Sequence, residues 1–462
     1  MRNVSVQSFT ATRNACKLCT PLGACLAFRG VEGAVPFLHG SQGCSTYIRR
    51  YLISHFKEPI DIACSNFGEA TAIFGGKENL RIGLATVNSQ YRPRLIGIAT
   101  TCLAETIGDD VEMFLYQIRE SFEEGSLPTV VSVSTPSYAG SHSEGYHAAV
   151  RTLVNTLTAE NSNTAMDGGG ESGQQHVNLM PGMLSPADIR YLKEICREFS
   201  LPVHVLPDYS ETLDGPVWSE YQQIPPGGAP LSHFRQAGMA LASVELGCTW
   251  GKEETAGALL AARYGVIRHE LPFPIGLRLT DNLFELLEEL SGHAVARRHV
   301  QERGRLLDAM IDAHKSVFGK RAVVYGEPDL VVGIASLLAE IGVVPAICAS
   351  GAATGHLSEA LAKVVPQLAA DMAVLEDHDF AEIEERAVDA NIDLVIGNSK
   401  GFKLSRRLNV PLVRVGFPIH DRVGGPRLLH VGYQGTQQLF DRIANALIGA
   451  KQAASPTGYT YM

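Results

Sequence analysis

The chain has 462 residues, of which 45% are hydrophobic and 19% are charged, and its formal net charge is −10. This length is too great for one hydrophobic core and predicts two to four domains, and the acidic balance argues against nucleic acid as a partner. No apolar run reaches the ~20 residues that span a bilayer and the N-terminus carries no signal peptide, so we expect a cytoplasmic protein with no membrane partner.

The first 157 residues alternate short apolar runs with amphipathic stretches, after a polar start without periodicity. We predict strands at residues 34–38, 95–99 and 129–133 and helices at residues 46–56 and 111–122. Alternating strands and helices indicate βαβ units and a parallel sheet. Ligands of such sheets gather beyond the carboxyl ends of the strands, which is where Cys102 and Ser137 fall.

A second α/β domain is predicted over residues 176–293, after a Gly-, Ser- and Asn-rich segment at residues 158–175 that we expect to be a flexible linker. Its expected strands lie at residues 177–180 and 203–206. Its expected helices lie at residues 186–199, 234–242 and 253–264.

A third α/β domain is predicted over residues 294–450, followed by a polar tail at 451–462 that we expect to be disordered or to lie on a partner. It opens with a helical run at residues 294–314. Strands are expected at residues 321–326, 343–348, 394–399 and 412–416, with a helix at residues 328–341. The fold class is therefore α/β, with three Rossmann-like domains whose parallel sheets surround a central cleft. No phosphate-binding glycine motif is present, so we expect no nucleotide site in this chain.

Six of the nine cysteines lie in the first 102 residues, which favours metal ligation over disulfides. Cys19 precedes a Thr-Pro turn, Cys44 ends the glycine-rich segment HGSQG, and Cys102 follows a buried strand. Glycine lets the backbone approach a bulky inorganic group, and several thiolates gathered in this way are what an iron–sulfur cluster needs. From the residues alone, three structural thiols are an equally good interpretation.

The chain resembles the β-type subunit of the nitrogenase component 1 family in the segments CTPLGA, HGSQGC, YIRRYLISHFKEP, FGG, TTCLAETIGDD, IGNSK and PLVRVGFPIHDR. This resemblance implies that Cys19, Cys44 and Cys102 are cluster ligands, shared with an α-type partner. The cluster would be of the eight-iron P-cluster type (8Fe-7S) or a four-iron cluster (4Fe-4S). Ser137 matches a serine that can bind the same cluster when it is oxidised, whereas an ordinary turn serine is the alternative.

The same resemblance implies an α₂β₂ heterotetramer that receives electrons from a separate ATP-dependent iron protein. That protein would dock near Phe74, for which a core phenylalanine before a glycine turn is the alternative. The chain would relay electrons to a catalytic metallocluster in the α-type subunit and make no bond to substrate, so we expect no catalytic residue in it.

Two functions compete within the family. The complete set of cluster residues favours a nitrogenase-like reductase, such as a methylthio-alkane reductase. The alternative is a NifN-like scaffold subunit for the biosynthesis of the nitrogenase iron-molybdenum cofactor. The short segment before Cys19 argues against a true nitrogenase β subunit.

A structural divalent cation is a further expectation. Asp308 and Asp312 are four residues apart in a predicted helix, so both carboxylates lie on one face. Glu58 matches a residue that completes a cation site between the two β subunits of the family, and the aspartate pair matches its other half. Three hard oxygen ligands suit Ca²⁺, Mg²⁺ or Fe²⁺. A solvated acidic face paired with Arg305 or Lys315 is the alternative.

Overall fold

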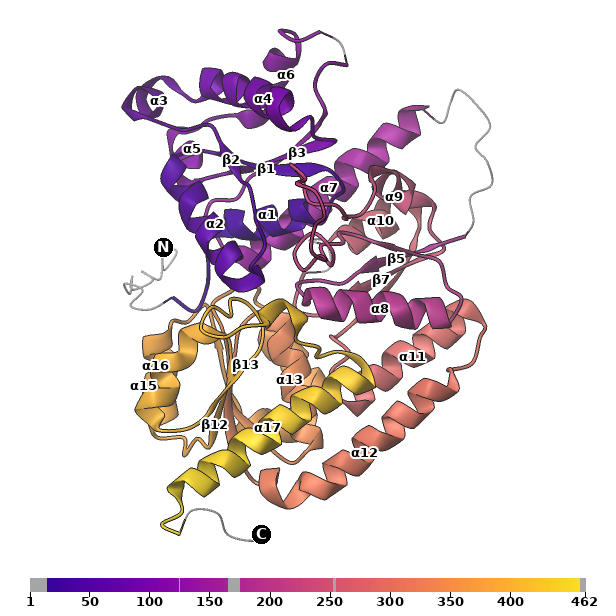
Figure 1. The fold of residues 1–462 in the computed structure, drawn as a ribbon, viewed down its shortest axis with the longest axis vertical. Helices are drawn as coiled ribbons and strands as arrows, with labels where there is room; N and C mark the ends of the chain where they lie inside the picture. Colours follow the sequence, from indigo (N-terminus) through magenta and orange to yellow (C-terminus); the bar gives the residue numbers. More distant parts are fainter. Residues whose placement is uncertain (1–14, 124, 165–174, 252–254, 458–462) are drawn as a thin grey trace, which may run out of the picture.

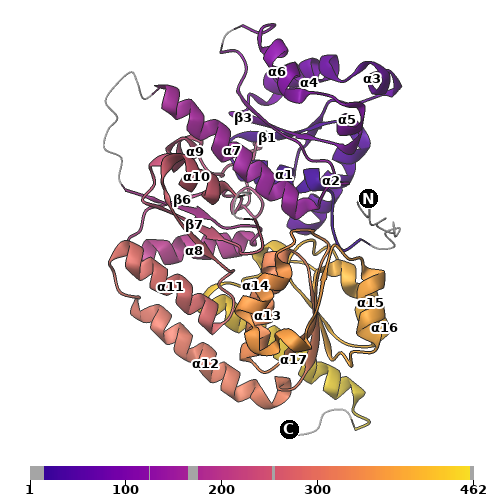
Figure 2. The same ribbon diagram turned by 180° about the vertical axis from the view of Figure 1, so that it is seen from behind.

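The computed structural model describes residues 15–123, 125–164, 175–251 and 255–457. Three α/β units, each built on its own parallel sheet, lie against one another (Figures 1 and 2). This confirms the α/β class with three parallel sheets. No helix in these ranges is both long enough and apolar enough to cross a membrane.

The first sheet has the strand order β2-β1-β3-β4. Its strands are β1 (Ala34–His39), β2 (Ala63–Cys64), β3 (Leu95–Thr100) and β4 (Thr129–Val133). Its helices are α1 (Thr20–Arg29), α2 (Gln42–Phe56), α3 (Glu69–Phe74), α4 (Lys77–Tyr91), α5 (Cys102–Ile107), α6 (Val111–Arg119) and α7 (His142–Thr164). Every residue of β1 and β3 is buried because helices cover both faces of the sheet. Leu38 packs on the α1 and α7 side, whereas Phe37 packs on the α4 and α6 side.

The second sheet has the order β6-β5-β7-β8. Its strands are β5 (Val177–Met180), β6 (Val203–Val205), β7 (Ala242–Leu246) and β8 (Ile267–Leu271). The helices of this unit are α8 (Pro186–Glu198), α9 (Leu231–Gln236), α10 (Ala256–Tyr264), α11 (Leu277–Ser291) and α12 (Arg297–Val317).

The third sheet has the order β11-β10-β9-β12-β13. Its strands are β9 (Arg321–Tyr325), β10 (Val344–Ser350), β11 (Ala373–Glu376), β12 (Leu394–Gly397) and β13 (Leu412–Arg414). Its helices are α13 (Pro328–Glu340), α14 (Leu357–Val364), α15 (Phe380–Val388), α16 (Phe402–Leu408) and α17 (Gly432–Ala454).

Three expected segments differ from the structure. Helix α7 continues to Thr164, so residues 158–164 are helical and not linker, while residues 165–174 lie outside the described ranges. The predicted end of the helix at residues 234–242 is wrong, because Ala242 already belongs to β7 and pairs with Val177 of β5. Helix α17 continues to Ala454, so the tail expected from residue 451 begins as helix, and residues 458–462 are not described.

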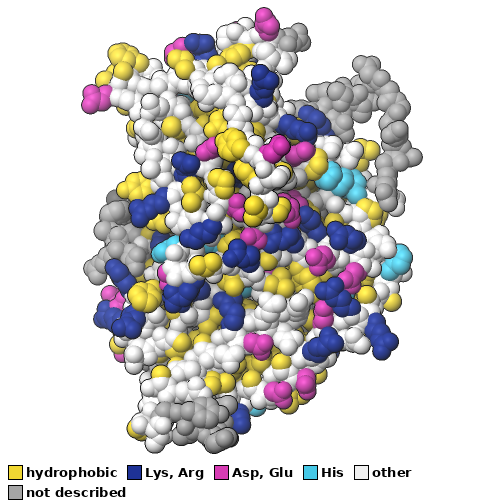
Figure 3. All heavy atoms as spheres, in the orientation of Figure 1, with side chains coloured by type: hydrophobic (Ala, Val, Ile, Leu, Met, Phe, Trp, Pro, Cys, Tyr) yellow, Lys and Arg dark blue, Asp and Glu magenta, His cyan; other side chains and the backbone are white. Residues whose placement is uncertain are grey.

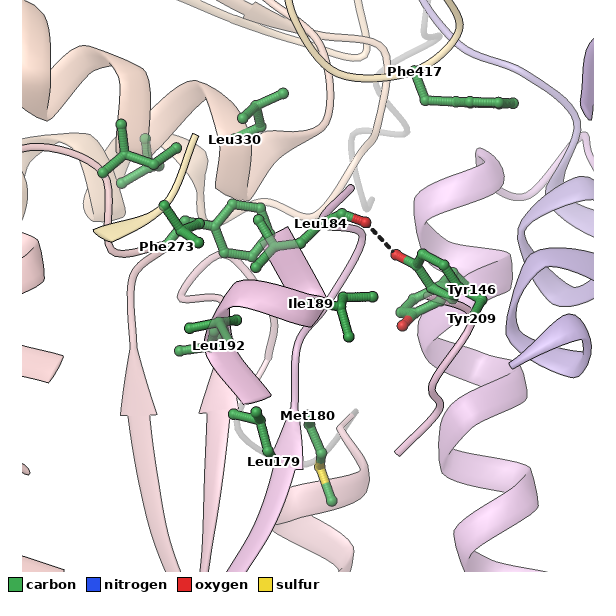
Figure 4. Close-up of a cluster of buried hydrophobic side chains, with 14 of the residues drawn as sticks. Tyr146, Leu179, Met180, Leu184, Ile189, Leu192, Tyr209, Phe273, Leu330 and Phe417 are labelled. Carbon is green, nitrogen blue, oxygen red and sulfur yellow. Dashed lines mark hydrogen bonds between the residues drawn. The ribbon is translucent and has the colours of Figure 1, made fainter. Parts of the chain in front are cut away.

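One hydrophobic core extends through all three units. Figure 4 shows Leu179 of β5, Tyr146 of α7 and Leu330 of α13 in the same cluster. In that cluster the Tyr209 hydroxyl donates a hydrogen bond to the Leu184 carbonyl at 2.6 Å. A cavity lined by Leu26, Leu184 and Leu330, one residue from each unit, measures about 30 Å³.

The order of the strands determines where the loops of each unit converge. In the first sheet the direction of winding reverses between β1 and β3, and in the third sheet it reverses between β9 and β12. A crevice opens beyond the carboxyl ends of parallel strands at such a reversal. The loop after β1 leads to Cys44, the loop after β3 leads to Cys102, and the loop after β12 ends at Lys400.

Candidate functional site

The three predicted cysteines each stand at the start of a helix. Cys19 is the N-cap of α1, Cys44 lies in the first turn of α2, and Cys102 is the first residue of α5. The unpaired N–H groups and the dipole of a helix N-terminus favour a negative sulfur. The Cys19 side of the site is exposed, and the other two cysteines are half-buried. All three thiols therefore occupy positions suited to binding a metal group at the surface of this chain.

The loops that carry Cys44 and Cys102 touch one another at a glycine. A Cβ atom on Gly40 would lie 1.9 Å from Oγ1 of Thr101, which is the N-cap of α5. Only glycine permits this approach. The segment HGSQG therefore brings the starts of α2 and α5 together.

The pKa of Cys19 depends on the other residues of the site. Burial raises the pKa of Cys19, a hydrogen bond with Ser137 lowers it, and negative charge on Cys44 and on Cys102 raises it further. Neighbouring thiolates repel one another, and a positive metal group between them would offset this repulsion.

Ser137 lies between the segments that carry Cys19 and Cys102. Its backbone N–H donates to Sγ of Cys102 at 3.3 Å, and its hydroxyl accepts a hydrogen bond from the Thr20 N–H at 3.2 Å. A second hydroxyl, that of Ser41, donates to Sγ of Cys44 at 3.7 Å. The serine predicted from sequence is thus placed beside two of the predicted cysteines.

The chemistry of these side chains suits an iron–sulfur cluster. Within the described ranges, no group of three or more His, Cys, Asp or Glu side chains could hold one metal ion. The donor set consists of thiolates with one nearby hydroxyl, which is the chemistry that iron–sulfur clusters use.

Three exposed apolar side chains each lie within three residues, along the chain, of a site residue. Tyr47 is 64% exposed, Leu103 is 37% exposed and Tyr138 is 69% exposed, and each is close in sequence to one of the four site residues. Large apolar side chains gathered on a surface mark an interaction site. This rim suits a protein partner that covers the site.

Phe74 is a surface residue. Its side chain is 86% exposed at the end of α3, next to Ile73, which is 75% exposed. Figure 3 shows hydrophobic side chains at the tip of the molecule that Figure 1 labels α3. The interpretation of Phe74 as a core residue is therefore wrong.

The three predicted cation ligands do not meet within one chain. Glu58 follows α2, where burial raises its pKa and the carboxylate of Asp214 raises it further. Asp308 and Asp312 are exposed on α12, and neither forms an ion pair with Arg305 or Lys315 within the described ranges. Figures 1 and 2 place α2 in the upper half of the molecule and α12 at its lower edge. A cation bound by all three residues requires a second copy of the chain.

One site residue was missed by the sequence reasoning. Lys400 reaches the segment that carries Cys19, since its Nζ donates a hydrogen bond to the carbonyl of Lys17 at 3.0 Å. The only signal in the sequence was its place in IGNSK, directly after a predicted strand. By contrast, Cys16 is buried, and burial raises the pKa of its thiol to about 12.

Comparison with known proteins gives the family. The sequence model of the nitrogenase component 1 type oxidoreductases matches residues 19–448. The chain is 33% identical to the nitrogenase molybdenum-iron protein beta chain of Methanothermobacter thermautotrophicus, over 96% of both chains. It is 32% identical to the nitrogenase iron-molybdenum cofactor biosynthesis protein NifN of Bradyrhizobium diazoefficiens, over 95% of this chain and 91% of that protein.

A solved structure described as nitrogenase Cp1 at pH 6.5 has the same fold, with a TM-score of 0.90 and 31% identity over 99% of this chain and 98% of that chain. The Methanothermobacter beta chain is matched over nearly its whole length, so the short segment before Cys19 does not separate this chain from nitrogenase beta chains. The expectation drawn from the shortness of that segment is therefore wrong. The chain belongs to the nitrogenase component 1 type oxidoreductase family and is one of its β-type members.

Proposed function

We propose that the chain is the β-type subunit of a nitrogenase-like α₂β₂ reductase and holds an iron–sulfur cluster of the P-cluster type at its interface with an α-type partner. The observation that carries this proposal is the position of Ser137, whose N–H donates to Sγ of Cys102 at 3.3 Å and whose hydroxyl accepts a hydrogen bond from the N–H of Thr20, the residue after Cys19. Cys19, Cys44 and Cys102 each also stand at a helix N-terminus. A purely structural role would not require three thiols at helix N-termini of which one is exposed and two are only half-buried.

The residues of the chain have distinct tasks at this site. When bound, the cluster supplies one-electron redox chemistry. Cys19, Cys44 and Cys102 provide thiolate ligands, and the helix N-termini behind them offset the negative charge. Ser137 offers a harder oxygen ligand, whose hydroxyl is already oriented by the Thr20 N–H. Three thiolates cannot enclose a large cluster, so the remaining ligands come from the α-type partner that covers the apolar rim.

Reduction by an ATP-dependent iron protein tests the relay function. In the anaerobic complex with the α-type partner, the cluster signal followed by electron paramagnetic resonance should change when the iron protein and ATP are added. Without ATP it should stay constant. A complex that contains iron but accepts no electrons from the iron protein would contradict the relay function.

Phe74→Ala should slow this electron delivery several-fold and leave the iron content unchanged. An exposed aromatic at the tip of α3 provides apolar contact area for the iron protein, and truncation of such an anchor costs about 1–2 kcal/mol of binding. Stopped-flow absorbance at limiting iron protein measures the rate. Phe318→Ala is the matched control, because Phe318 is 64% exposed at the end of α12, far from α3 in Figure 1. Equal rates for both variants would remove Phe74 from the docking surface.

A NifN-like scaffold is the second candidate, because identity to the Bradyrhizobium NifN is 32% over 95% of this chain. The two functions differ in what leaves the complex. A scaffold releases a metallocluster precursor that activates a cofactor-deficient nitrogenase, whereas a reductase keeps its metal and turns over substrate. Incubation of the loaded complex with cofactor-deficient nitrogenase, followed by metal analysis of both proteins, separates them.

The proposed structural cation is tested by assembly. Asp308→Ala combined with Asp312→Ala should shift the α₂β₂ complex toward αβ halves, because the cation bridges two copies of the chain. Native mass spectrometry measures the distribution. Glu285→Ala with Glu289→Ala is the control, since these residues form an exposed pair at the same spacing on α11. An intact tetramer without bound cation in the aspartate variant would exclude the site.

A further inference from the structure

Lys400 is held in a fixed loop at the carboxyl end of β12. Its backbone N–H donates to Oδ1 of Asn398 at 3.1 Å, and Nδ2 of Asn398 donates to the Phe417 carbonyl at 2.9 Å. This loop lies at the winding reversal of the third sheet, between β9 and β12. The loop is therefore a rigid support for the lysine side chain.

The lysine reaches the segment that carries Cys19. Nζ of Lys400 donates a hydrogen bond to the Lys17 carbonyl at 3.0 Å, and Nζ of Lys17 lies 2.7 Å from Oδ1 of Asp377. A Cβ atom on Gly351 would lie 2.6 Å from the carbonyl carbon of Cys16, so the segment rests directly on the loop after β10. Residues of the third unit thus hold the segment that carries Cys19, whereas the other residues of the site belong to the first unit.

The first unit holds the same segment from its other side. The backbone N–H of His142, at the start of α7, donates to the Leu18 carbonyl at 3.0 Å. The Leu18 N–H in turn donates to Nδ1 of His142 at 3.3 Å. Cys19 is therefore fixed between two units, with Lys400 as the cationic contact on one side.

The charge of Lys400 has no carboxylate partner. Within the described ranges no Asp or Glu oxygen lies within 4 Å of its Nζ, although the residue is half-buried. Burial lowers the pKa of Lys400, and the thiolates of Cys16 and Cys19 raise it. Cys19 lies two residues after Lys17, whose carbonyl accepts the hydrogen bond from Nζ of Lys400. The positive charge of Lys400 is therefore placed at the segment that carries Cys19.

We propose that Lys400 is a positioning residue that holds the Cys19 segment and, through its positive charge, raises the reduction potential of the cluster. This inference rests on the proposed function. A fixed positive charge near a metal group favours the state with the additional electron, and hydrogen bonds and charges around the ligands are established means of tuning a metal site. The third unit would thereby set the redox property of a cluster whose ligands come from the first.

Lys400→Met tests the proposal, because methionine keeps most of the length of the side chain and removes the charge. In the anaerobic complex its cluster should have a more negative midpoint potential than wild type, measured by redox titration with electron paramagnetic resonance. Lys400→Arg keeps the charge, so its midpoint potential should be closer to that of wild type. Lys403→Met is the matched control, since Lys403 is exposed on α16 and solvent screens its charge.

The outcomes are distinguishable from those of the proposed function. Iron content equal to wild type with an unchanged potential in Lys400→Met would overturn the role of Lys400 and leave the cluster in place. Equal loss of iron in Lys400→Met and Lys400→Arg would also overturn the electrostatic role, because the charge would then not matter. A wild-type complex without iron would instead refute the proposed function.

Discussion

Cys44→Ala is expected to remove most of the iron and acid-labile sulfide from the anaerobically purified complex. Cys44 stands in the first turn of α2, where its Sγ accepts a hydrogen bond from the Ser41 hydroxyl at 3.7 Å. Loss of one of three thiolates on this side leaves the cluster with an open iron and an unshielded helix N-terminus. Iron and sulfide analysis per heterotetramer measures the effect.

Two further variants test whether the loss of iron is specific to the Cys44 thiolate. Cys64→Ala is the control, because Cys64 is a half-buried thiol of β2 in the same unit and has no part in the site. It should keep the wild-type iron content. Cys44→Ser should retain an intermediate amount, since its oxygen is a harder and weaker ligand for reduced iron. Wild-type iron in Cys44→Ala would exclude this cysteine as a ligand.

Asp329→Ala should lower the stability of the chain by about 3–5 kcal/mol, because it leaves several buried donors without an acceptor. The Asp329 carboxylate is fully buried at the start of α13. It accepts hydrogen bonds from the N–H of Cys248 at 2.7 Å, from the N–H and hydroxyl of Thr249 at 3.0 and 2.9 Å, and from Nε1 of Trp250 at 2.8 Å. These donors follow β7, so this one side chain connects the second sheet to the third.

Calorimetry gives the shift of the unfolding temperature, and the fluorescence of Trp250 reports on the site itself. Asp329→Asn should lower the unfolding temperature less than Asp329→Ala. Its remaining side-chain oxygen can keep three of the four hydrogen bonds, while its amide group faces the indole N–H. Asp371→Ala is the control, at an exposed carboxylate at the end of a short 3₁₀ helix. An unfolding temperature of Asp329→Ala equal to that of the control would show that the connection does not stabilise the chain.

The placement of the cysteines can be predicted from sequence because it depends on local rules. A buried apolar run predicts a strand, and the polar or glycine-rich residues that follow it predict a loop at the carboxyl edge. Cys102 directly follows such a run, and Cys44 follows another through HGSQG. Parallel strands place both loops at one edge of the sheet, so the sequence pattern alone predicts that two of the three ligands lie near one another.

Other features depend on contacts between distant parts of the chain. The residues from Ala242 form a strand because they pair with β5 on one side and β8 on the other, and this pairing overrides the helical composition of the preceding segment. The extension of α7 to Thr164 does not follow from local composition, because the Asn, Ser and Thr residues of 158–164 favour a loop. Leu153 and Leu157, directly before this segment, are buried, so packing stabilises the part of α7 from which the helix continues.

The sequence by itself determined the α/β class, the carboxyl-edge positions of Cys44 and Cys102, and the membership of the family through its motifs. Only the tertiary structure decided that Phe74 is exposed, that Ser137 lies between Cys19 and Cys102, and that Lys400 contacts the Cys19 segment. The physical reason is the range of the interactions. Periodicity and turn chemistry act over about ten residues, whereas the contact of Lys400 with Lys17 joins residues 383 positions apart and exists only because the first and third units pack together.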